Sequence, residues 1–378
     1  MNILICCEFY SPSVGGVEKV AEQLAKNFKI YGHNVSIATS KYNKRLFKSE
    51  ILDNIKIHRF EISGNFKKGL RGNVNEYQKF LTSNKYDVIL FYAAQQWTLD
   101  AALPILDKIK TNIYLATCGF SGLKKIGYKN YFKILKKKLF YFNRNIVHSN
   151  NYIDTMFLKK NKIKNKTLIP NAAENIFNKK NNSNFFYLKR INEAKKNILN
   201  ISNYKFNKGQ DISILVFFLL KYKDKINLIF IGNKFNSKIY FYYIRILKFF
   251  TEFFFKNKKI LFLEDVSRKN VLSAYTESDV FLFTSRLECS PLVLFESAAA
   301  GLPFISLKVG NSYEISRWTK AGIVSDNIFQ ASKKLNFFLK NDKYCSVLSK
   351  NGKKNYIKKF NWKKISIEYL RVFKKYNL

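Results

Sequence analysis

Short apolar runs typical of β-strands alternate with helical apolar patterns along most of the chain. The first run, Asn2–Cys7, is followed by apolar residues spaced by three and four between Val17 and Phe28, which indicates an amphipathic helix. The later strand-like runs are Asn34–Thr39, Ile55–Phe60, Asp87–Tyr92, Asn112–Thr117, Asn145–His148, Asn197–Ile201, Asn227–Ile231, Ile260–Leu263, Val280–Thr284 and Phe304–Leu307. Helical patterns in the second half are Gln210–Tyr222, Ile239–Phe254, Arg268–Tyr275 and Pro291–Ala300. Because a helix between two strands lets them pair in parallel, the pattern predicts an α/β protein with parallel sheets.

The alternation pauses once, and this pause divides the chain into two halves. From Lys159 to Asn184 the sequence is dominated by Lys and Asn. A chain of 378 residues suits two domains of about 150–200 residues each. We therefore predict an N-terminal domain over 1–174, a linker over 175–184 and a C-terminal domain over 185–359. One more amphipathic helix is predicted from Trp362 to Tyr376.

The chain is strongly basic, with 67 Lys and Arg against 26 Asp and Glu, which gives a formal net charge of +41. Such a charge is typical of proteins that bind nucleic acid, anionic membranes or phosphorylated substrates. The abundance of Lys, Asn, Phe and Ile also fits an AT-biased genome, which would produce the same excess without any function. A basic nucleic-acid-binding protein is therefore one alternative, although paired carboxylates would have no role in it.

The cysteines and histidines argue against a disulfide framework and against a metal site. The five cysteines are odd in number, scattered and without a CxxC pair, and the three histidines are far apart in sequence. A reducing cytoplasm is the expected location. The N-terminal run enters Glu8 without the basic segment of a signal peptide, and the apolar stretches near 214–220 and 239–255 are too short or too interrupted to cross a membrane.

The segment 285–303 carries the most informative chemistry. It follows the predicted strand Val280–Thr284, and open parallel sheets bind ligands at the carboxyl ends of their strands. Ser290 is predicted as the N-cap and Pro291 as the first residue of a helix that ends at Gly301. Ser290 is also a candidate donor-binding residue.

The start of this helix is a predicted phosphate site. The backbone N–H groups of Leu292 and Val293 have no partner within the helix, and the helix dipole favours an anion there. Glu288 precedes the helix and Glu296 lies within it, so both carboxylates can accept hydrogen bonds from sugar hydroxyls on either side of a diphosphate. Each carboxylate alone is equally explained as a solvated charge, but the combination favours a ligand site.

Two further loops follow the first predicted strand of each half. Gly15 and Gly16 open the first helix, where paired glycines let the backbone approach a ligand closely. The surrounding sequence is not GxGxxG, which disfavours a nicotinamide dinucleotide. Lys208 lies in the loop Ser202–Gly209, where a cation can neutralise a diphosphate leaving group. Taken alone, the glycines also fit a tight turn, and Lys208 is one of many lysines.

Taken together, these segments resemble glycosyltransferase family 4, the group 1 retaining transferases of the GT-B fold. The motifs occur in the order Pro-x-x-Gly-Gly-Val-Glu, Lys208-Gly209, Glu288-x7-Glu296 with Ala-Gly-x-Pro, and Phe-Asn-Trp at 360–362. The resemblance covers almost the whole chain, and the Glu-x7-Glu segment is its specific part. It implies two Rossmann-like parallel-sheet domains facing across a cleft. It also implies that a C-terminal helix over 360–378 packs back on the N-terminal domain.

The resemblance implies a role for each motif residue. Glu296 would hold the nucleotide ribose, and Glu288 would hold the hydroxyls of the donor sugar. Lys208 would stabilise the charge of the departing diphosphate. The diphosphate would also contact the backbone amides of Gly16, Leu292 and Val293. The donor would be a nucleotide-diphosphate sugar bound as a substrate, and neither a metal nor another cofactor is expected.

Three positions depart from the pattern of this family. Asn203, a candidate donor contact, stands where the family often has an Arg beside the phosphates, so one cationic partner is lost unless Lys205 replaces it. Cys118 stands near the place of a His on the acceptor side in many members, and Ser121 in the same loop is a second acceptor-side candidate. Ser290-Pro291 replaces the common Phe-Gly. The departures at Asn203 and Cys118 leave a catalytically inactive scaffold as a further alternative, whereas Ser290-Pro291 still suits the start of a helix.

The expected reaction is a retaining transfer of a hexosyl group to a glycan or lipid-linked acceptor. No carboxylate is obviously placed as a covalent nucleophile, so we expect a front-face reaction in which a phosphate oxygen acts as the base. Electrostatic stabilisation of the diphosphate would then carry catalysis. Surface polysaccharide or lipopolysaccharide biosynthesis is the expected pathway.

The segment from Gly122 to Ile146 contains eight basic residues and no acidic one, with aromatic and apolar residues interleaved at helical spacing. Two interpretations are open. Its apolar side packs into the first domain, or it is a basic amphipathic helix that rests on the anionic inner face of the cytoplasmic membrane. The candidate membrane contacts are Lys133, Lys136, Lys137 and Lys138.

Overall fold

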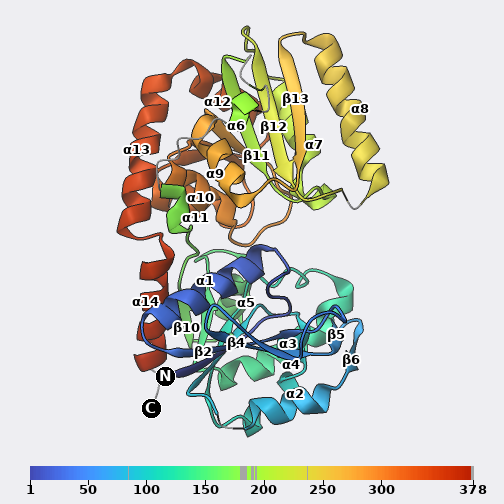
Figure 1. Ribbon diagram of the computed structural model, residues 1–378, viewed down its shortest axis with the longest axis vertical. Helices are drawn as coiled ribbons and strands as arrows, with labels where there is room; N and C mark the ends of the chain where they lie inside the picture. The colour runs from blue at the N-terminus through green and yellow to red at the C-terminus, as the bar shows by residue number, and fades with distance from the viewer. Residues whose placement is uncertain (84, 179–184, 189–190, 192–193, 236, 376–378) are drawn as a thin grey trace. The chain divides into compact units, whose positions relative to one another are not determined.

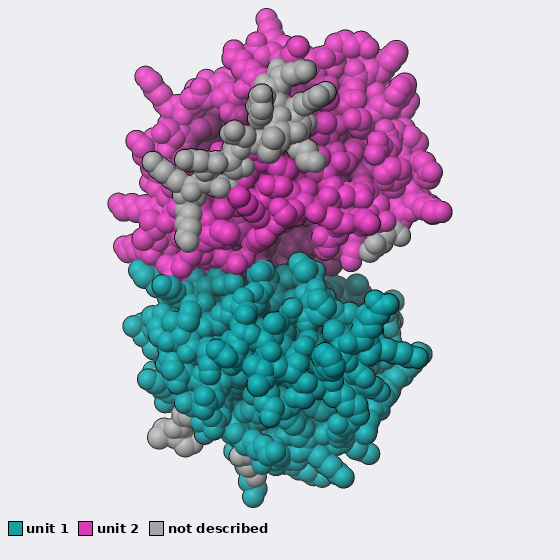
Figure 2. Space-filling view, in the orientation of Figure 1, with its two compact units in different colours: residues 1–171, 362–378 teal, residues 172–361 magenta. Residues whose placement is uncertain are grey.

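The computed structural model of the chain describes residues 1–83, 85–178, 185–188, 191, 194–235 and 237–375. The chain forms two compact units, which Figure 2 shows in different colours. Unit 1 consists of Met1–Asn171 and Trp362–Leu378, and unit 2 consists of Ala172–Asn361. Among the described residues, no helix combines the length and the apolar character needed to cross a bilayer.

Unit 1 contains an eight-stranded sheet in the order β10-β9-β8-β7-β1-β2-β4-β3 (Figure 1). The strands are β1 (Asn2–Cys6), β2 (Asn34–Ser40), β3 (Ser49–Leu52), β4 (Ile55–Phe60), β7 (Val88–Tyr92), β8 (Asn112–Ala116), β9 (Arg144–Val147) and β10 (Lys166–Leu168). Adjacent strands are parallel except β3 and β4, which form an antiparallel hairpin. A separate antiparallel pair joins β5 (Ile62–Asn65) to β6 (Gly69–Gly72).

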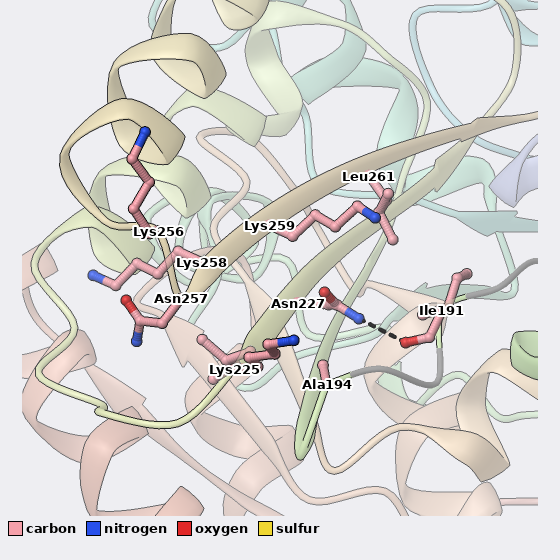
Figure 3. Close-up of a pocket in the computed structure, with 10 residues that line it drawn as sticks. Ile191, Ala194, Lys225, Asn227, Lys256, Asn257, Lys258, Lys259 and Leu261 are labelled. Atoms are coloured by element: carbon pink, nitrogen blue, oxygen red, sulfur yellow. Dashed lines mark hydrogen bonds between the residues drawn. The ribbon is translucent and has the colours of Figure 1, made fainter.

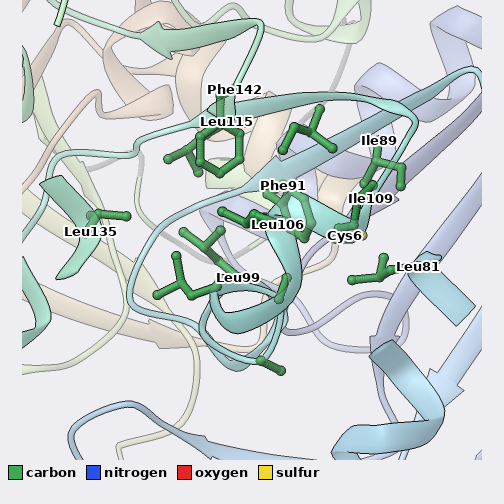
Figure 4. Packing of buried hydrophobic residues seen from close by; sticks show 14 of the residues in the cluster. Cys6, Leu81, Ile89, Phe91, Leu99, Leu106, Ile109, Leu115, Leu135 and Phe142 are labelled. Carbon is green, nitrogen blue, oxygen red and sulfur yellow. The ribbon is translucent and has the colours of Figure 1, made fainter. Parts of the chain in front are cut away.

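The helices of unit 1 bury apolar side chains against this sheet. They are α1 (Gly16–Ile30), α2 (Val74–Leu81), α3 (Trp97–Asp100), η1 (Leu103–Lys108), η2 (Ile126–Tyr128), α4 (Lys129–Lys138), η3 (Leu139–Tyr141), α5 (Ile153–Lys160) and α14 (Trp362–Lys375). On one face, Ile89 and Phe91 of β7 and Leu115 of β8 lie in a single cluster with Leu106 of η1 and Leu135 of α4 (Figure 4). This burial of apolar surface is the main force that holds the helices on the sheet.

The C-terminal helix belongs to unit 1, which confirms the prediction that it packs back on the N-terminal domain. The rings of Tyr369 and Phe373 on α14 meet Phe28 of α1 edge to face, with centroids 6.4 and 5.8 Å apart. The Tyr114 hydroxyl of β8 donates to the Phe373 carbonyl at 3.3 Å. These contacts tie the last helix to the first helix and to the sheet. The predicted last residue of the helix, Tyr376, lies outside the described residues.

Helix α4 turns its apolar side inward, as the first of the two interpretations of this segment predicts. Tyr131, Phe132 and Leu135 are buried in the core cluster of unit 1. The basic side of the helix faces solvent: Lys133, Lys136 and Lys137 are exposed and Lys138 is half-buried. The apolar spacing therefore reflects packing within the unit, while a contact of these lysines with a membrane stays a prediction.

Unit 2 contains a six-stranded parallel sheet in the order β13-β12-β11-β14-β15-β16. The strands are β11 (Lys196–Ile201), β12 (Ile226–Gly232), β13 (Lys258–Glu264), β14 (Val280–Phe283), β15 (Phe304–Leu307) and β16 (Gly322–Ser325). The helices are η4 (Asn175–Asn178), α6 (Phe185–Leu188), η5 (Phe206–Lys208), α7 (Gln210–Phe218), α8 (Lys238–Phe254), α9 (Arg268–Glu277), α10 (Leu292–Ala300), α11 (Ser312–Thr319), α12 (Ile328–Lys340) and α13 (Asp342–Lys358).

Alternate residues of these strands enter two different cores. Leu199 of β11 and Phe281 of β14 pack with residues of α9, α10 and α13, whereas their neighbours Ile198 and Leu282 pack with residues of α7, α8 and α12. This is the alternation expected of a strand buried on both faces. The sheet of unit 2 is therefore the middle layer of three, as in doubly wound folds.

The predicted strands agree with the observed ones to within two residues, but several short strands escaped prediction. β3 and β10 lie at opposite edges of the sheet of unit 1, and neither has a buried residue, so neither shows the apolar run of a central strand. The predicted linker also differs. Asn175–Asn178 form η4, and its Phe177 is buried in the core of unit 2, while 179–184 lie outside the described residues.

Candidate functional site

In unit 2, two loops leave the sheet at its topological switch point, where the order of the strands reverses. Chain order runs outward from β11 to β13 on one side and from β14 to β16 on the other. Because β11 and β14 are neighbours, the loops that follow them leave the carboxyl edge of the sheet side by side. Doubly wound sheets bind ligands at this switch point. The loop after β11 carries Lys208, and the loop after β14 carries Glu288.

Lys208 and Glu288, the two predicted catalytic residues, are in direct contact. Lys208 Nζ donates to Glu288 Oε1 at 2.6 Å, although 80 residues separate them in sequence. The Ser285 hydroxyl donates to the same carboxylate oxygen at 2.8 Å. The side chains of Lys208 and Glu288 are 25% and 14% exposed, so both remain accessible to a ligand. The sheet thus assembles a cation and a carboxylate at the edge where a ligand is expected.

Hydrogen bonds and a second ion pair hold the two loops together. The Thr284 hydroxyl donates to the Gly209 carbonyl at 2.7 Å, and the Arg286 amide donates to the Asn207 carbonyl at 2.9 Å. The Arg286 guanidinium binds both carboxylate oxygens of Asp211, at 2.8 and 2.6 Å. A bidentate pair of this kind fixes orientation as well as distance. The Lys208–Glu288 contact therefore rests on a braced pair of loops.

Gly209 is required by this close approach of the two loops. Its φ is +68°, and a Cβ added there would lie 2.1 Å from the Thr284 carbonyl oxygen. Gly209→Ala is therefore expected to lower the free energy of unfolding by about 2–4 kcal/mol, measured by urea denaturation. The control is Gly16→Ala, because a Cβ at Gly16 would meet nothing within 4 Å and should change stability by less than about 0.5 kcal/mol. Equal stability of the Gly209→Ala and wild-type proteins would contradict the requirement for glycine.

Helix α10 begins one residue later than predicted. Pro291 has an extended ψ of 117° and is the N-cap, so Leu292 is the first helical residue. Ser290 is not the N-cap; its hydroxyl accepts a hydrogen bond from Asn311 Nδ2 at 3.2 Å. The amides of Leu292 and Val293 are the first two of the helix, where N–H groups have no partner in the helix itself. The helix ends at Gly301, which is left-handed with φ 76°, as the sequence predicts.

Glu296 is buried and already has two protein partners. Its Oε1 accepts from Arg268 Nη2 at 2.9 Å and its Oε2 from the Tyr275 hydroxyl at 3.1 Å. Arg268 Nη2 also donates to Glu174 Oε1 at 2.5 Å. A carboxylate offers about four lone-pair directions, so Glu296 retains capacity for a ribose hydroxyl. Arg268 could not be predicted as part of the site, since one Arg at the start of a helix carries no signal in so basic a chain.

Asn203 and Lys205 occupy the first half of the loop after β11. The Asn203 carbonyl accepts a hydrogen bond from Gln210 Nε2 at 2.9 Å, and the residue is half-buried. Lys205 is exposed and precedes η5, in which Lys208 is the last residue. Lys208 is therefore the lysine of this loop that is paired with a site carboxylate, while a role for Lys205 as the second cation stays a prediction.

The glycine loop in unit 1 follows β1 at the switch point of its own sheet, where β1 and β7 are neighbours. Gly15 is the N-cap of α1, and Gly16 is its first residue. A Cβ at Gly15 would lie 2.4 Å from Glu18 Oε2, so the glycine leaves room for this side chain. The Ser13 hydroxyl lies 3.4 Å from Glu18 Oε1. This loop has the geometry of a helix N-terminus open to a ligand, and its contact with a diphosphate stays a prediction.

Cys118, one of the two acceptor-side candidates, lies beside a histidine that no sequence motif marks. Cys118 Sγ is 3.8 Å from His148 Nε2, and burial raises the pKa of the Cys118 thiol. His148 Nδ1 lies 2.8 Å from the Ile169 carbonyl, so Nδ1 carries the proton and Nε2 faces the Tyr92 hydroxyl at 3.2 Å. Burial lowers the pKa of His148. Ser121 is exposed three residues after Cys118.

A second group of unit 1 residues surrounds a cavity of about 290 Å³. It is lined by Glu8, Ser63, Gly64, Asn65, Lys68, Gly69 and Arg71. Burial, together with the negative charges of Asp100 and Glu18, raises the pKa of Glu8 to about 7. Burial also raises the pKa of Asp100 to about 6, although the hydrogen bond that its carboxylate accepts from the Phe66 amide acts to lower this pKa. This group could not be predicted from sequence because β5 and β6, which carry five of the seven lining residues, have no apolar run.

The raised pKa of Glu8 predicts a pH dependence of stability. The ordinary pKa of a Glu side chain is about 4.5. Between that pH and a pH of about 7, Glu8 keeps its proton in the folded protein but releases it in the unfolded chain, so rising pH destabilises the fold across this window. Glu8→Gln should therefore gain stability relative to wild type as the pH rises from about 5 to about 8, and the two proteins should converge at the acidic end. Urea unfolding at several pH values measures the difference. A constant difference over that range would show that Glu8 has an ordinary pKa.

Comparison with known families identifies unit 2. Residues 183–355 match the family described as glycosyl transferases group 1. Unit 2 is a group 1 glycosyltransferase domain. The matched range contains Lys208, Glu288 and Glu296, three of the residues that carry the sequence resemblance. A comparison with curated proteins gave no match.

Solved structures share the fold of the whole chain, the group 1 domain included. Sucrose-phosphate synthase from Thermosynechococcus elongatus is similar with a TM-score of 0.82 and 14% identity, over 99% of this chain and 98% of that one. A glycosyltransferase from Rickettsia africae has a TM-score of 0.78 and 16% identity over 99% and 98%. Anabaena HepE in complex with UDP-glucose has a TM-score of 0.76 and 13% identity over 99% and 100%. The chain therefore has the two-domain α/β fold of GT-B glycosyltransferases, as predicted.

Proposed function

We propose that this protein transfers a sugar from a nucleotide-diphosphate sugar to a glycan or a lipid-linked acceptor. The observation that carries the proposal is the Lys208–Glu288 contact of 2.6 Å beside the start of α10, in the group 1 domain. A cation, a carboxylate and free helix amides are the groups that a sugar attached to a diphosphate requires. The similar Anabaena HepE was crystallised with UDP-glucose, which supports a donor of this class.

The donor diphosphate would bind at the start of α10, between the amides of Leu292 and Val293 and the ammonium group of Lys208. Glu288 would accept hydrogen bonds from hydroxyls of the donor sugar, and Glu296 would hold the ribose. When the sugar–phosphate bond breaks, negative charge grows on the diphosphate, and Lys208 would stabilise it. The Lys208–Glu288 pair would keep the ammonium group in position before the donor arrives.

We further propose that the transfer retains the configuration at the anomeric carbon, as in glycosyltransferase family 4. Glu288 is held by Lys208 and Ser285, so it suits recognition of hydroxyls better than nucleophilic attack. A phosphate oxygen of the leaving diphosphate would accept the proton of the acceptor hydroxyl, and the acceptor would attack from the same face. The acceptor would lie near Cys118, Ser121 and His148 of unit 1.

We propose that the reaction needs no divalent metal and no other cofactor. Lys208 and the amides of α10 can balance the charge of the diphosphate, which a cation balances in metal-dependent transferases. Transfer should therefore persist in excess chelator. The proposed location is the cytoplasm, on the inner face of the membrane, where an enzyme of surface polysaccharide or lipopolysaccharide biosynthesis would meet a lipid-linked acceptor.

The proposal is tested by incubating the protein with UDP-, GDP- and ADP-sugars, with and without chelator, and quantifying the nucleoside diphosphate that is released. We expect release from at least one donor, at the same rate in chelator, and loss of release in Glu288→Ala. Loss of activity in chelator that added metal restores would contradict metal independence. Release by Glu288→Ala at the wild-type rate would contradict the assignment of the site.

A further inference from the structure

Helix α8 of unit 2 presents an apolar face to solvent along its whole length. Figure 1 shows α8 at the outer side of unit 2, beside β13. The large apolar residues on this face, each between 40% and 85% exposed, are Ile239, Tyr242, Tyr243, Ile246, Phe249, Phe250, Phe253 and Phe254. Their spacing of three and four places them on one side of the helix. Exposed apolar surfaces of this extent mark sites of interaction.

The opposite side of α8 packs against the core of unit 2. Tyr240 and Ile244 are buried in the core between the sheet and α7, and Leu247 packs against that core. The Tyr240 hydroxyl donates to Gln210 Oε1 at 2.8 Å. A surface helix normally carries polar residues on its outer side, whereas α8 is apolar on both. The outer face is therefore not needed for the packing of unit 2.

Basic residues border the apolar face. Arg245 lies over the Phe241 ring at 4.8 Å, and Lys256 lies over the Phe253 ring at 5.5 Å. The one acidic residue of the helix, Glu252, is paired with Lys248 at 3.0 Å and accepts from the Ile260 amide. Long cationic side chains beside aromatic rings are typical of proteins that lie at the surface of anionic membranes.

More lysines lie just beyond the C-terminal end of α8. Lys225, Lys256 and Lys259, all exposed, line a cavity of about 180 Å³ where β12 and β13 begin, at the edge of the sheet opposite to the candidate site (Figure 3). Lys258 also borders it, but its Nζ donates to the carbonyls of Phe217, Phe218 and Leu220 and so serves the fold. These lysines therefore add exposed ammonium groups at the end of unit 2 where α8 ends.

We propose that α8 docks unit 2 on an anionic lipid surface, with its aromatic face among the acyl chains and its basic residues at the phosphates. A helix of 17 residues is about 25 Å long, and Arg245, Lys248 and Glu252 interrupt its sequence, so α8 lies along the surface. A second copy of the chain suits this face less, because a two-fold contact would bring the same basic borders of two chains of charge +41 together. The proposal rests on α8 and goes beyond the proposed transfer reaction.

Co-sedimentation with vesicles tests this docking. The vesicles contain phosphatidylcholine alone or with about one-third phosphatidylglycerol. Wild type should bind the anionic vesicles, and the triple variant Ile246→Ser, Phe249→Ser, Phe253→Ser should bind roughly 100-fold more weakly. The variant Lys225→Gln, Lys256→Gln, Lys259→Gln should lose roughly 10-fold or more, mainly at low salt. The matched control is Phe329→Ser, at an aromatic residue of α12 that is 62% exposed, and it should bind as wild type does.

Two further measurements separate the outcomes. In Phe249→Trp, the fluorescence should shift to shorter wavelength with anionic vesicles, which reports burial even where binding is weak. Nucleotide binding by the serine variant should equal that of wild type, so a failure of lipid docking is distinguishable from a failure of the proposed reaction. Equal vesicle binding by the serine variant and wild type, or absence of wild-type binding, would overturn the proposal. A dimer that wild type forms in sedimentation and the serine variant does not would also overturn the proposal, because the face would then bind a second copy. The same holds if the serine variant binds vesicles normally and binding is weaker in a variant with Lys133, Lys136, Lys137 and Lys138 changed to Gln.

Discussion

Lys208→Ala is expected to lower the turnover of donor by about 100–1000-fold, which is the scale for removing one group that stabilises the charge of a transition state. The side chain is the cation paired with Glu288 at the switch point of the sheet. Its loss removes the counter-charge of the leaving diphosphate and leaves Glu288 without its ammonium partner. The measurement is the steady-state rate of nucleoside diphosphate release. Lys221→Ala, at an exposed lysine after α7, serves as the control and should retain the wild-type rate.

The double variant Lys208→Ala, Glu288→Ala tests whether the two residues act as one unit. Because they are in direct contact, the double variant should be about as slow as the slower single variant. Losses that multiply would show that Lys208 and Glu288 act independently. A wild-type rate in Lys208→Ala would remove this lysine from the mechanism.

Arg268→Ala is expected to damage both stability and donor affinity. The guanidinium lies between Glu174 and Glu296, and Glu296 is 6% exposed. Among the described residues, removing Arg268 leaves the buried Glu296 carboxylate with the Tyr275 hydroxyl as its remaining partner. Breaking a fully buried pair costs about 3–5 kcal/mol, and since the Arg268 side chain is 40% exposed we expect about 2 kcal/mol. Urea unfolding measures this loss.

A second substitution separates the charge of Glu296 from its role in donor binding. Glu296→Gln in the Arg268→Ala protein removes the unpaired charge and should restore most of the lost stability. Donor affinity should stay roughly 10-fold or more below wild type, because the carboxylate that would hold the ribose is gone. Recovery of donor affinity together with stability would show that Glu296 is a structural residue and not a donor contact.

Much of this site could be predicted from sequence because its parts are fixed by strand ends. Lys208 follows β11 and Glu288 follows β14, and two neighbouring parallel strands deliver both loops to one edge. Glycines and a proline also mark the borders of the motif helix, although the true N-cap is Pro291 and not Ser290. Local spacing therefore sufficed for the fold, for the carboxylates and for the end of α10 at Gly301.

Contacts between distant segments could not be predicted in this way. Arg268 reaches Glu296 from a different helix, and His148 approaches Cys118 from a different strand. Neither pair has a fixed spacing that a pattern can detect. The spacing of apolar residues along a helix also does not show whether their side faces the core or solvent. The stripe of α4 faces the core, while α8 has apolar residues on both sides.

The proposed reaction requires that unit 2 binds a nucleoside diphosphate through Lys208 and the start of α10. Calorimetric titration of UDP, GDP and ADP into the wild-type protein and the Lys208→Ala variant tests it most directly. At least one of these ligands should bind wild type, and Lys208→Ala should bind that ligand roughly 10-fold or more weakly, since a charge-assisted contact to phosphate is lost. Equal affinity in the two proteins, or no binding of any of the three to wild type, would contradict the account.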